Sequence, residues 1–421
     1  MPDEKNGRES RKNRRRMMNS AFRSIRAGTA STIRGTKRAA GAFDTFTHAE
    51  QATGAARSAP TRWLNKMLSK TGLWGILAIA LVFVLVLVAY IQNSVVNVDR
   101  QYIYVVGLEQ ELEGYNILHI SDLHGRTFGE SQRSLLRTIG DLSYQMVVFS
   151  GDMVGASGNP QPFYDILEGL PASRPKFFIP GDSDPPIFVE TPRGEGKLEN
   201  VVLADWVLGA QERGAKLLSY TQSVTVSGRR IWLSPQSMMN VNLLETVRML
   251  EEQMNLEKMG VISGLESSKK RLPVTNYRYN AALLSQKASA EMGGSDVHVA
   301  VTHMPPSDAF LQTARQRGEE DTIAYLPAVD IILSGHYCGG GSKAPFGRAV
   351  YIPDDLAPKR GWLPNPRDVD GKKTVGLSTQ YTSAGLGTTD KIALLDWRLF
   401  NPPTISVLTL TAEVTNDLVR D

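Results

Sequence analysis

Cysteine is nearly absent from this chain of 421 residues, which has a single one, Cys338. One cysteine excludes an intramolecular disulfide. No internal repeat is apparent either. With 42% apolar and 21% charged residues, the composition is that of one large globular domain with accessory segments. The lone thiol stands among residues that could bind a metal ion, which makes it a candidate ligand.

Large apolar side chains and acidic side chains are scarce at the N-terminus. Residues 1–70 carry 16 Lys and Arg against 5 Asp and Glu, a net charge of +11, whereas the remainder has a net charge of −7. We predict a basic, disordered cytoplasmic tail over residues 1–70. Anionic lipid would attract it by about 1 kcal/mol per basic residue near the surface. No nucleic-acid partner is expected, because the tail does not pair its basic residues with stacking aromatics.

The chain has one long apolar run, from Gly72 to Ile91, and that run has no charged residue. Twenty helical residues span roughly 30 Å, the thickness of a bilayer core. A signal peptide would begin nearer the N-terminus, and a buried core helix would show a polar face. We therefore predict a transmembrane helix over residues 71–92. The basic N-terminal flank places the tail in the cytoplasm and the rest of this single-pass protein outside the cell membrane.

Metal-binding types of residue follow five short apolar runs. Buried strands of an α/β sheet have this pattern, and helical patterns lie between the runs, so we expect a parallel or mixed sheet. Side chains at the carboxyl ends of such strands meet at one edge. The glycines in three of these segments are expected to allow sharp turns. The five segments are Asp122-Leu123-His124, Gly151-Asp152, Gly181-Asp182-Ser183-Asp184, Thr302-His303 and Gly335-His336-Tyr337-Cys338.

Residues 236–297 look like a helical insertion into this pattern. Asn242 followed by Glu245 is typical of a helix start, and Gly260 of a helix end. Leu243, Val247, Leu250 and Met254 form an apolar stripe between these signals. We favour packing of the stripe onto the domain body, and a lid over the site is the alternative.

Asp and His side chains gathered in this way suit phosphoryl chemistry. A phosphate ester repels hydroxide because both are anionic, and a pair of divalent metals neutralises the ester and generates hydroxide at neutral pH. Mixed imidazole and carboxylate ligands favour Mn, Fe or Zn over Ca.

The order of the segments resembles the signature of the calcineurin-like metallophosphoesterases, which is Asp-x-His, Gly-Asp, Gly-Asn-His-Asp, a lone His and Gly-His-x-His. The chain is similar to a bacterial, membrane-anchored phosphodiesterase-like subgroup, since residues 335–340, 383–388 and 398–403 resemble its motifs. The resemblance implies a sandwich of two mixed β-sheets flanked by helices. It divides the chain into the tail, the transmembrane helix, a linker and lead-in strand over 93–113, a metallophosphoesterase domain over 114–412 and a C-terminal tail over 413–421.

The resemblance also implies roles for individual residues. Two divalent ions (Mn, Fe, Zn or Mg) would be held, with Asp152 bridging them. Ser183 occupies the position of the family's proton-donating histidine, which Asp184 would orient. The remaining ligands would be Asp122, His124 and Cys338 for one ion, and Asp182, His303 and His336 for the other.

Three residues depart from the family pattern. Asp182 replaces Asn and adds a negative charge, and Cys338 replaces His with a thiolate that suits Zn. Ser183 replaces His, and a serine does not donate a proton near neutral pH. Loss of such general-acid help costs about 10²–10⁴-fold in rate.

Two functions follow as expectations. The first is a metal-dependent hydrolase of a phosphomonoester, phosphodiester or pyrophosphate, with a lipid-linked or cell-envelope substrate. The alternative is a catalytically degenerate member that serves as a binding or scaffold protein. His119, His298 and Asp330 are expected to be structural.

Overall fold

The computed structural model describes residues 70–191, 200–260, 265–345, 347–352, 361–366, 369–388 and 398–413. The predicted basic tail and the last eight residues lie outside these ranges. The chain divides into two units, residues 1–77 and 78–421. The second unit holds both sheets and every candidate site residue.

The apolar run forms helix α3, Lys70–Ser94, as predicted. Among the described residues it is the one helix long and apolar enough to cross a membrane, judged by length and composition. Its apolar side chains are mostly exposed, which would be costly in water and is normal in lipid. A single-pass anchor is compatible with this helix, while its orientation stays a prediction.

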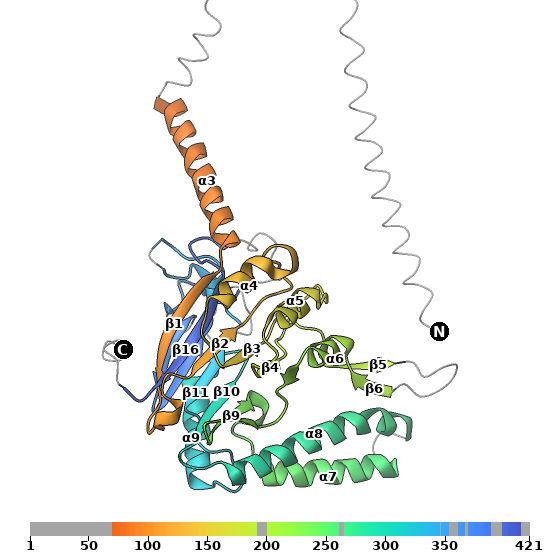
Figure 1. The fold of residues 1–421 in the computed structure, drawn as a ribbon. Helices are drawn as coiled ribbons and strands as arrows, with labels where there is room; N and C mark the ends of the chain where they lie inside the picture. The colour runs from red at the N-terminus through yellow and green to blue at the C-terminus, as the bar shows by residue number, and fades with distance from the viewer. Residues whose placement is uncertain are drawn as a thin grey trace, which may run out of the picture. The chain divides into compact units, whose positions relative to one another are not determined.

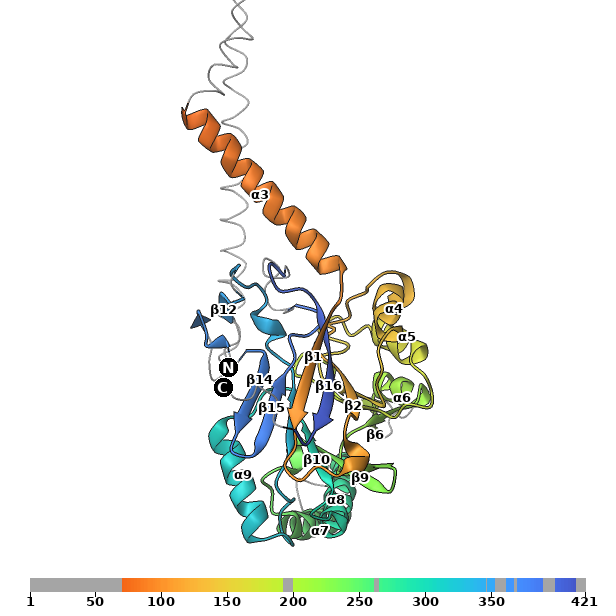
Figure 2. The ribbon, with the colours of Figure 1, turned by 60° about the vertical axis from the view of Figure 1, so that its left-hand side comes forward.

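Two six-stranded sheets form the body (Figures 1 and 2). In the first sheet the order is β1-β16-β2-β3-β4-β7, and β2, β3, β4 and β7 run parallel. Strand β16 is antiparallel to β2 and parallel to the edge strand β1. The bounds are β1 Asn97–Tyr104, β2 Asn116–Ile120, β3 Met146–Ser150, β4 Lys176–Ile179, β7 Ala215–Leu217 and β16 Thr404–Thr411.

The second sheet has the order β14-β15-β11-β10-β9-β8, with β15, β11, β10 and β9 parallel and the two edge strands antiparallel to their neighbours. Strands β8 and β9 are the two arms of a hairpin with Ser227-Gly228 at its turn. The bounds are β8 Gln222–Val226, β9 Arg229–Pro235, β10 Val297–Val301, β11 Ile331–Ser334, β14 Gly371–Val375 and β15 Ser378–Thr382.

The alternation of side chains along each strand builds three layers of core. Ile117 on β2, Val299 on β10 and Leu333 on β11 meet between the sheets, and their neighbours Leu118 and Ile332 face outward. Helices α4 (Arg133–Gly140), α5 (Gln161–Gly169) and α6 (Asp205–Glu212) cover the first sheet, and α9 (Asp308–Glu320) covers the second. The fold is thus α/β with two mixed sheets flanked by helices, as predicted.

The described part of residues 236–297 is largely helical, as predicted, while its being an insertion stays a prediction. Helix α7 (Leu243–Met259) and helix α8 (Leu265–Glu291) lie side by side (Figure 1). The side chain of Asn242 accepts a hydrogen bond from the N–H of Glu245, and Gly260 ends α7 with a φ of 70°. Both helix boundaries are therefore where the sequence predicts them.

The remaining elements are short. A two-stranded arm, β5 (Phe188–Thr191) and β6 (Asn200–Leu203), precedes α6, and β12 (Tyr351–Ile352) pairs with β13 (Gly361–Trp362). The 3₁₀ turns are η1 Gln110–Leu112, η2 Glu130–Gln132, η3 Gln236–Met238 and η4 Cys338–Gly340.

Candidate metal centre

The loops that follow β2, β3 and β4 in one sheet, and β10 and β11 in the other, bring all seven predicted ligands together. Within each sheet these strands are parallel, so their carboxyl ends lie at the same edge. The side chains fall into three overlapping groups whose ligand atoms lie within 4.8 Å of one another. The groups are Asp122, His124 and Cys338; Asp182, His303 and His336; and Asp122, Asp152 and His303.

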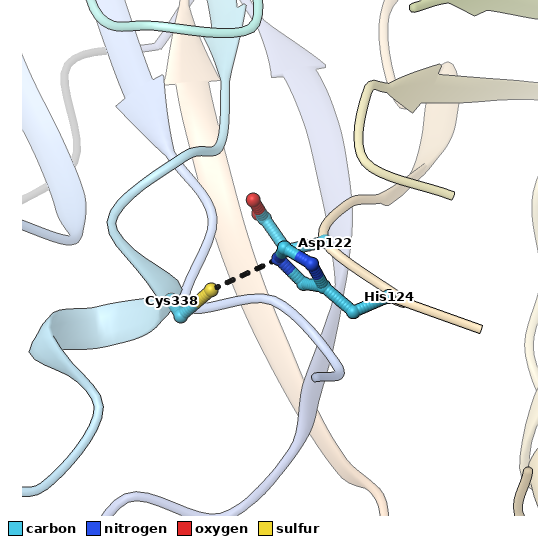
Figure 3. A group of neighbouring side chains, drawn as sticks. All are labelled: Asp122, His124 and Cys338. Atoms are coloured by element: carbon cyan, nitrogen blue, oxygen red, sulfur yellow. Dashed lines mark hydrogen bonds between the residues drawn. The ribbon is translucent and has the colours of Figure 1, made fainter. Parts of the chain in front are cut away.

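The first group combines oxygen, nitrogen and sulfur donors. The Cys338 Sγ atom points toward the imidazole of His124 and lies 3.7 Å from its Nε2 atom (Figure 3). Asp122 is fully buried, and its Oδ1 atom accepts a hydrogen bond from the backbone N–H of His336 at 2.8 Å. This bond ties the loop after β2 to the loop after β11.

The second group has only nitrogen and oxygen donors. Asp182 Oδ1 lies 2.9 Å from His303 Nε2 and 3.2 Å from His336 Nδ1. The Nδ1 atom of His303 faces the carbonyl oxygen of Ser150 at 2.9 Å. Because a carbonyl only accepts, Nδ1 carries the proton, and Nε2 presents its lone pair to the group when the ring is neutral.

Asp152 lies between the two groups. One of its oxygens, Oδ2, is 3.2 Å from His303 Nε2 and 3.5 Å from His124 Nε2. Its other oxygen accepts a hydrogen bond from the backbone N–H of Ser183 at 2.8 Å. A single carboxylate therefore reaches both groups, the position that a bridging ligand needs.

The backbone of the ligand loops is strained. Asp122, His124, Asp152, His336 and Cys338 all have φ between 48° and 78°, a region that residues other than glycine seldom adopt. Such strain costs of order 1–3 kcal/mol per residue and concentrates at functional sites. The sequence gives no direct sign of it.

The motif glycines act mainly through their lack of a side chain. Gly151 does have a positive φ of 97°, but Gly181 and Gly335 do not. A Cβ atom at Gly181 would overlap the Asp152 carboxylate, and one at Gly335 would overlap that of Asp122. The expectation of sharp turns is therefore wrong for these two, which are required because ligand oxygens pack against their α-carbons.

The electrostatics link the acids and imidazoles of the site. Burial alone would lower the pKa of His303, but hydrogen bonds to Asp152 and Asp182 raise it well above the usual 6.5. Hydrogen bonds from His303 and His336 hold the pKa of Asp182 far below its ordinary value. Burial raises the pKa of the Cys338 thiol, with the negative charge of Asp122 adding to the effect. Without a metal, a proton on His303 balances part of the carboxylate charge.

Divalent cations fit these residues. Asp122 Oδ2 is buried and has no hydrogen-bond partner among the described residues, which is costly unless it binds something else. Donor atoms around a cation bound at about 2.1 Å lie roughly 3–4 Å apart. The donor separations of 2.9–3.7 Å described above match this spacing.

Asp184 fixes the loops around Asp152. Its carboxylate accepts hydrogen bonds from the backbone N–H groups of Val154, Gly155 and Gly181 at 2.7–2.9 Å. Burial raises the pKa of this carboxyl group. These bonds join the loop after β3 to the loop after β4, and the roles of Asp184 and Ser183 in catalysis stay predictions.

Two residues that support the site were not assigned a role from the sequence. Arg398 is fully buried and donates to the carbonyl oxygens of Ala384, Gly387 and Asn401. The Asn401 amide in turn donates to the carbonyls of Cys338 and Gly341 at 2.9 and 2.8 Å. Burial lowers the pKa of Arg398 to about 10. A buried arginine looks like a surface arginine in a sequence, so only the structure shows this support.

The C-terminal end of α3 is bonded to the same support. Asn93 donates to the carbonyl oxygen of Arg398 at 2.8 Å, and Gln92 accepts from the N–H of Phe400 at 2.8 Å. The Asn93 carbonyl accepts from Arg126, two residues after the ligand His124, at 2.9 Å. The helix therefore ends against loops that carry or support the first ligand group.

His119, His298 and Asp330, which were expected to be structural, are held by hydrogen bonds within the fold. His119 is fully buried, bonds to Ser150 Oγ at 2.7 Å, and has its pKa lowered by burial to about 3. His298 is held by Ser234 and the carbonyl of Pro327, and Asp330 caps its N–H at 2.8 Å.

A two-sheet sandwich with carboxylate, imidazole and thiol ligands at its shared edge defines a metal-dependent phosphoesterase fold. The family model described as calcineurin-like phosphoesterase matches residues 115–339. The chain belongs to this family, which is metal-dependent.

Two solved structures illustrate the likeness. The phosphopantetheinyl hydrolase from Mycobacterium tuberculosis is 12% identical, with 65% of this chain and 91% of that chain covered and a TM-score of 0.31. The calcineurin-like phosphoesterase YfkN from Bacillus subtilis is 13% identical, with 70% and 91% covered and a TM-score of 0.27. No curated protein matches the chain.

Proposed function

We propose that this protein is a membrane-anchored hydrolase of a phosphomonoester, phosphodiester or pyrophosphate bond, with its N-terminus in the cytoplasm and its catalytic domain outside the cell. The observation that carries the proposal is the pair of three-residue ligand groups with Asp152 between them. A site for two divalent cations that share one carboxylate has this arrangement.

The protein's own residues would bind the cations, orient the substrate and balance its negative charge. Cations held here would supply Lewis-acid polarisation of the phosphoryl oxygens and a water of lowered pKa. The backbone N–H groups of His336 and Ser183 hold Asp122 and Asp152 in position. Asp184 fixes the loops on either side of Asp152. A pre-set ligand geometry of this kind reduces the reorganisation that the reaction would otherwise require.

Ser183 restricts the substrates that can be cleaved efficiently. A leaving group that departs as a weak base, such as a phosphate of a pyrophosphate or an aryl oxide, needs little proton donation. With an alkoxide leaving group, the missing general acid would lower the rate about 10²–10⁴-fold.

The bonds between α3 and the loops of the first ligand group support a substrate at the membrane surface. If α3 spans the bilayer, then Gln92 and Asn93 leave the hydrocarbon beside these loops. A lipid-linked or cell-envelope phosphoester would meet the site without leaving the membrane.

The test uses the full-length protein in lipid nanodiscs, stripped of metal and reloaded with Mn, Fe, Zn or Mg. We expect hydrolysis of p-nitrophenyl phosphate, bis(p-nitrophenyl) phosphate or an alkyl pyrophosphate with at least one metal. Asp152→Asn should lower kcat by roughly 10³-fold or more, because it weakens both ion positions. If no metal restores turnover of any of the three bond types, the enzymatic proposal is wrong.

The degenerate alternative rests on Ser183 and Cys338, the two replacements at ligand and proton-donor positions. Ser183→His distinguishes the two functions. A non-enzyme would gain measurable turnover from a null background. An enzyme would already turn over, and the variant would raise kcat chiefly for substrates with poor leaving groups.

A further inference from the structure

A cavity of about 690 Å³ lies beside the second ligand group. Its lining includes His303, a member of that group, and Pro180, two residues before Asp182. The cavity therefore begins where a substrate phosphate would bind. Its volume falls in the range of about 300–1,000 Å³ that is typical of small-molecule sites.

The helical insertion builds one side of this cavity. Leu250 of α7 and Ala281 of α8 line it, and Ile179 and Val301, at the ends of β4 and β10, line the opposite side. Tyr277 of α8 contacts the ring of Phe188, on the β5–β6 arm, edge to face at 5.1 Å between centroids. Both rings belong to the wall. The insertion thus encloses a space next to the site.

The apolar stripe of α7 has two different fates. Leu243 and Met254 are buried and α7 packs chiefly against α8, whereas Leu250 is only partly buried and lines the cavity. Leu250 therefore lies near the candidate site, while packing of the stripe onto the domain body stays a prediction.

The chemistry of the lining selects the ligand. Twelve of the nineteen lining residues are apolar, alanine and proline included. The others are Ser219, Gln236, Ser237, Thr246, Tyr277, Arg278 and His303. A nucleobase or sugar would need several convergent hydrogen-bonding groups deep in the pocket. A hydrocarbon chain needs none and gains from leaving water.

We propose that this cavity binds the hydrocarbon chain of a lipid phosphate whose phosphoryl group lies at the two ligand groups. The inference rests on the proposed function and names its substrate class. Because the cavity begins at His303, the orientation of the substrate follows. Its phosphate would bind at the ligand groups, and its hydrocarbon chain would lie between the insertion and the strand ends.

The experiment measures binding rather than turnover. Methyl-, butyl- and octylphosphonate share one headgroup and are titrated by calorimetry into the full-length, Mn-loaded protein in nanodiscs, with empty nanodiscs as the blank. Each buried methylene should tighten binding about two- to fourfold, so the seven extra methylenes of octylphosphonate should tighten binding at least about 100-fold over methylphosphonate.

Two variants remove the chain site, and each has a matched control. Ala281→Trp fills the cavity, and Ala290→Trp places the same side chain on the exposed side of the same helix. Leu250→Asn makes the wall polar, and Met249→Asn makes the same change at the exposed neighbour. The first member of each pair should cut the octyl-to-methyl ratio to below about tenfold, leave methylphosphonate binding unchanged and keep the metal content. The controls should keep the full ratio.

The outcomes separate this inference from the proposed function. Binding of methylphosphonate with no gain from chain length overturns the cavity inference and leaves the metal-directed function intact. Octylphosphonate binding that Ala281→Trp abolishes, but that needs no metal, supports the chain site and counts against the metal-directed function. No binding of octylphosphonate, with or without Mn, overturns the inference outright.

Discussion

The two ligand groups share Asp152 but differ in donors, burial and support. Asp122 and Cys338 of the first group are 0% and 3% exposed, and the carbonyl of Cys338 is held by Asn401. The Asp182 side chain of the second group is 33% exposed, and His303 borders the large cavity. One group is enclosed and contains sulfur, while the other is open and has only nitrogen and oxygen donors.

This difference indicates a division of labour. A buried thiolate with a rigid support favours tight retention of a soft cation such as Zn. An accessible carboxylate beside a cavity favours a cation that exchanges more readily and meets the substrate. The following changes test that division, from the largest expected effect to the smallest.

Cys338→Ser should weaken cation binding at the first group alone. Even outer partners of a metal site change affinity about 10–100-fold, and a direct ligand should reach the upper end of that range. Calorimetric titration with cobalt measures both affinities in each protein, and the sulfur-to-cobalt charge-transfer absorption of the unmodified protein identifies which of the two binding steps belongs to the first group. Equal weakening of both groups would contradict the comparison.

Lowering the pH should weaken cation binding at the first group, because the Cys338 thiolate would be protonated. Burial raises the pKa of Cys338, so the metal-free thiol is protonated at neutral pH and binding must displace its proton. Affinity therefore rises with pH, by about tenfold per unit for this one proton. Calorimetry in buffers of different ionisation enthalpy should show one proton fewer released by Cys338→Ser, and an unchanged proton count would show that sulfur is not a ligand.

Asn401→Ala should act on the first group from outside it. The change removes donors from the carbonyls of Cys338 and Gly341, which costs about 1–3 kcal/mol when those oxygens stay buried. We expect cobalt affinity at the first group to fall about tenfold and the second group to be unchanged. Asn280→Ala, at an exposed position of α8, is the control and should alter neither.

Asp182→Asn should have the smallest effect, and only on the second group. It restores the family's residue and removes one negative charge from the side that faces the substrate. Cation affinity should fall by a few fold while KM for an anionic phosphoester falls as well, because the site repels phosphate less. Glu212→Gln removes an exposed charge on α6 and should leave KM unchanged. A rise in KM with Asp182→Asn would place the substrate elsewhere.

Much of the architecture could be predicted because its causes are local. The strands before Asp122, Asp152 and His303 are short apolar runs, and such runs report burial directly. Helix α7 is capped by Asn242 and Gly260. The Asn242 side chain accepts a hydrogen bond from a free backbone N–H at the start, and Gly260 adopts the left-handed conformation that ends the helix.

The rest depends on contacts between distant segments, which no local pattern contains. The overlap that Gly335 avoids is with Asp122, more than two hundred residues earlier. Arg398 is charged and yet buried, because three carbonyl oxygens from two loops accept hydrogen bonds from its guanidinium group. The apolar stripe of α7 predicts one apolar face of the helix. It does not predict whether Leu250 on that face packs against another side chain or lines a cavity.

Hydrogen bonds join Gln92 and Asn93, at the C-terminal end of α3, to loops that carry or support the first ligand group. If the proposed function is right and α3 spans the bilayer, the site would act on substrate in a thin layer next to the lipid rather than throughout the solvent. Its rate should then follow the number of substrate molecules per unit of membrane area, and diluting a lipid phosphate with inert lipid should slow it even at constant bulk concentration.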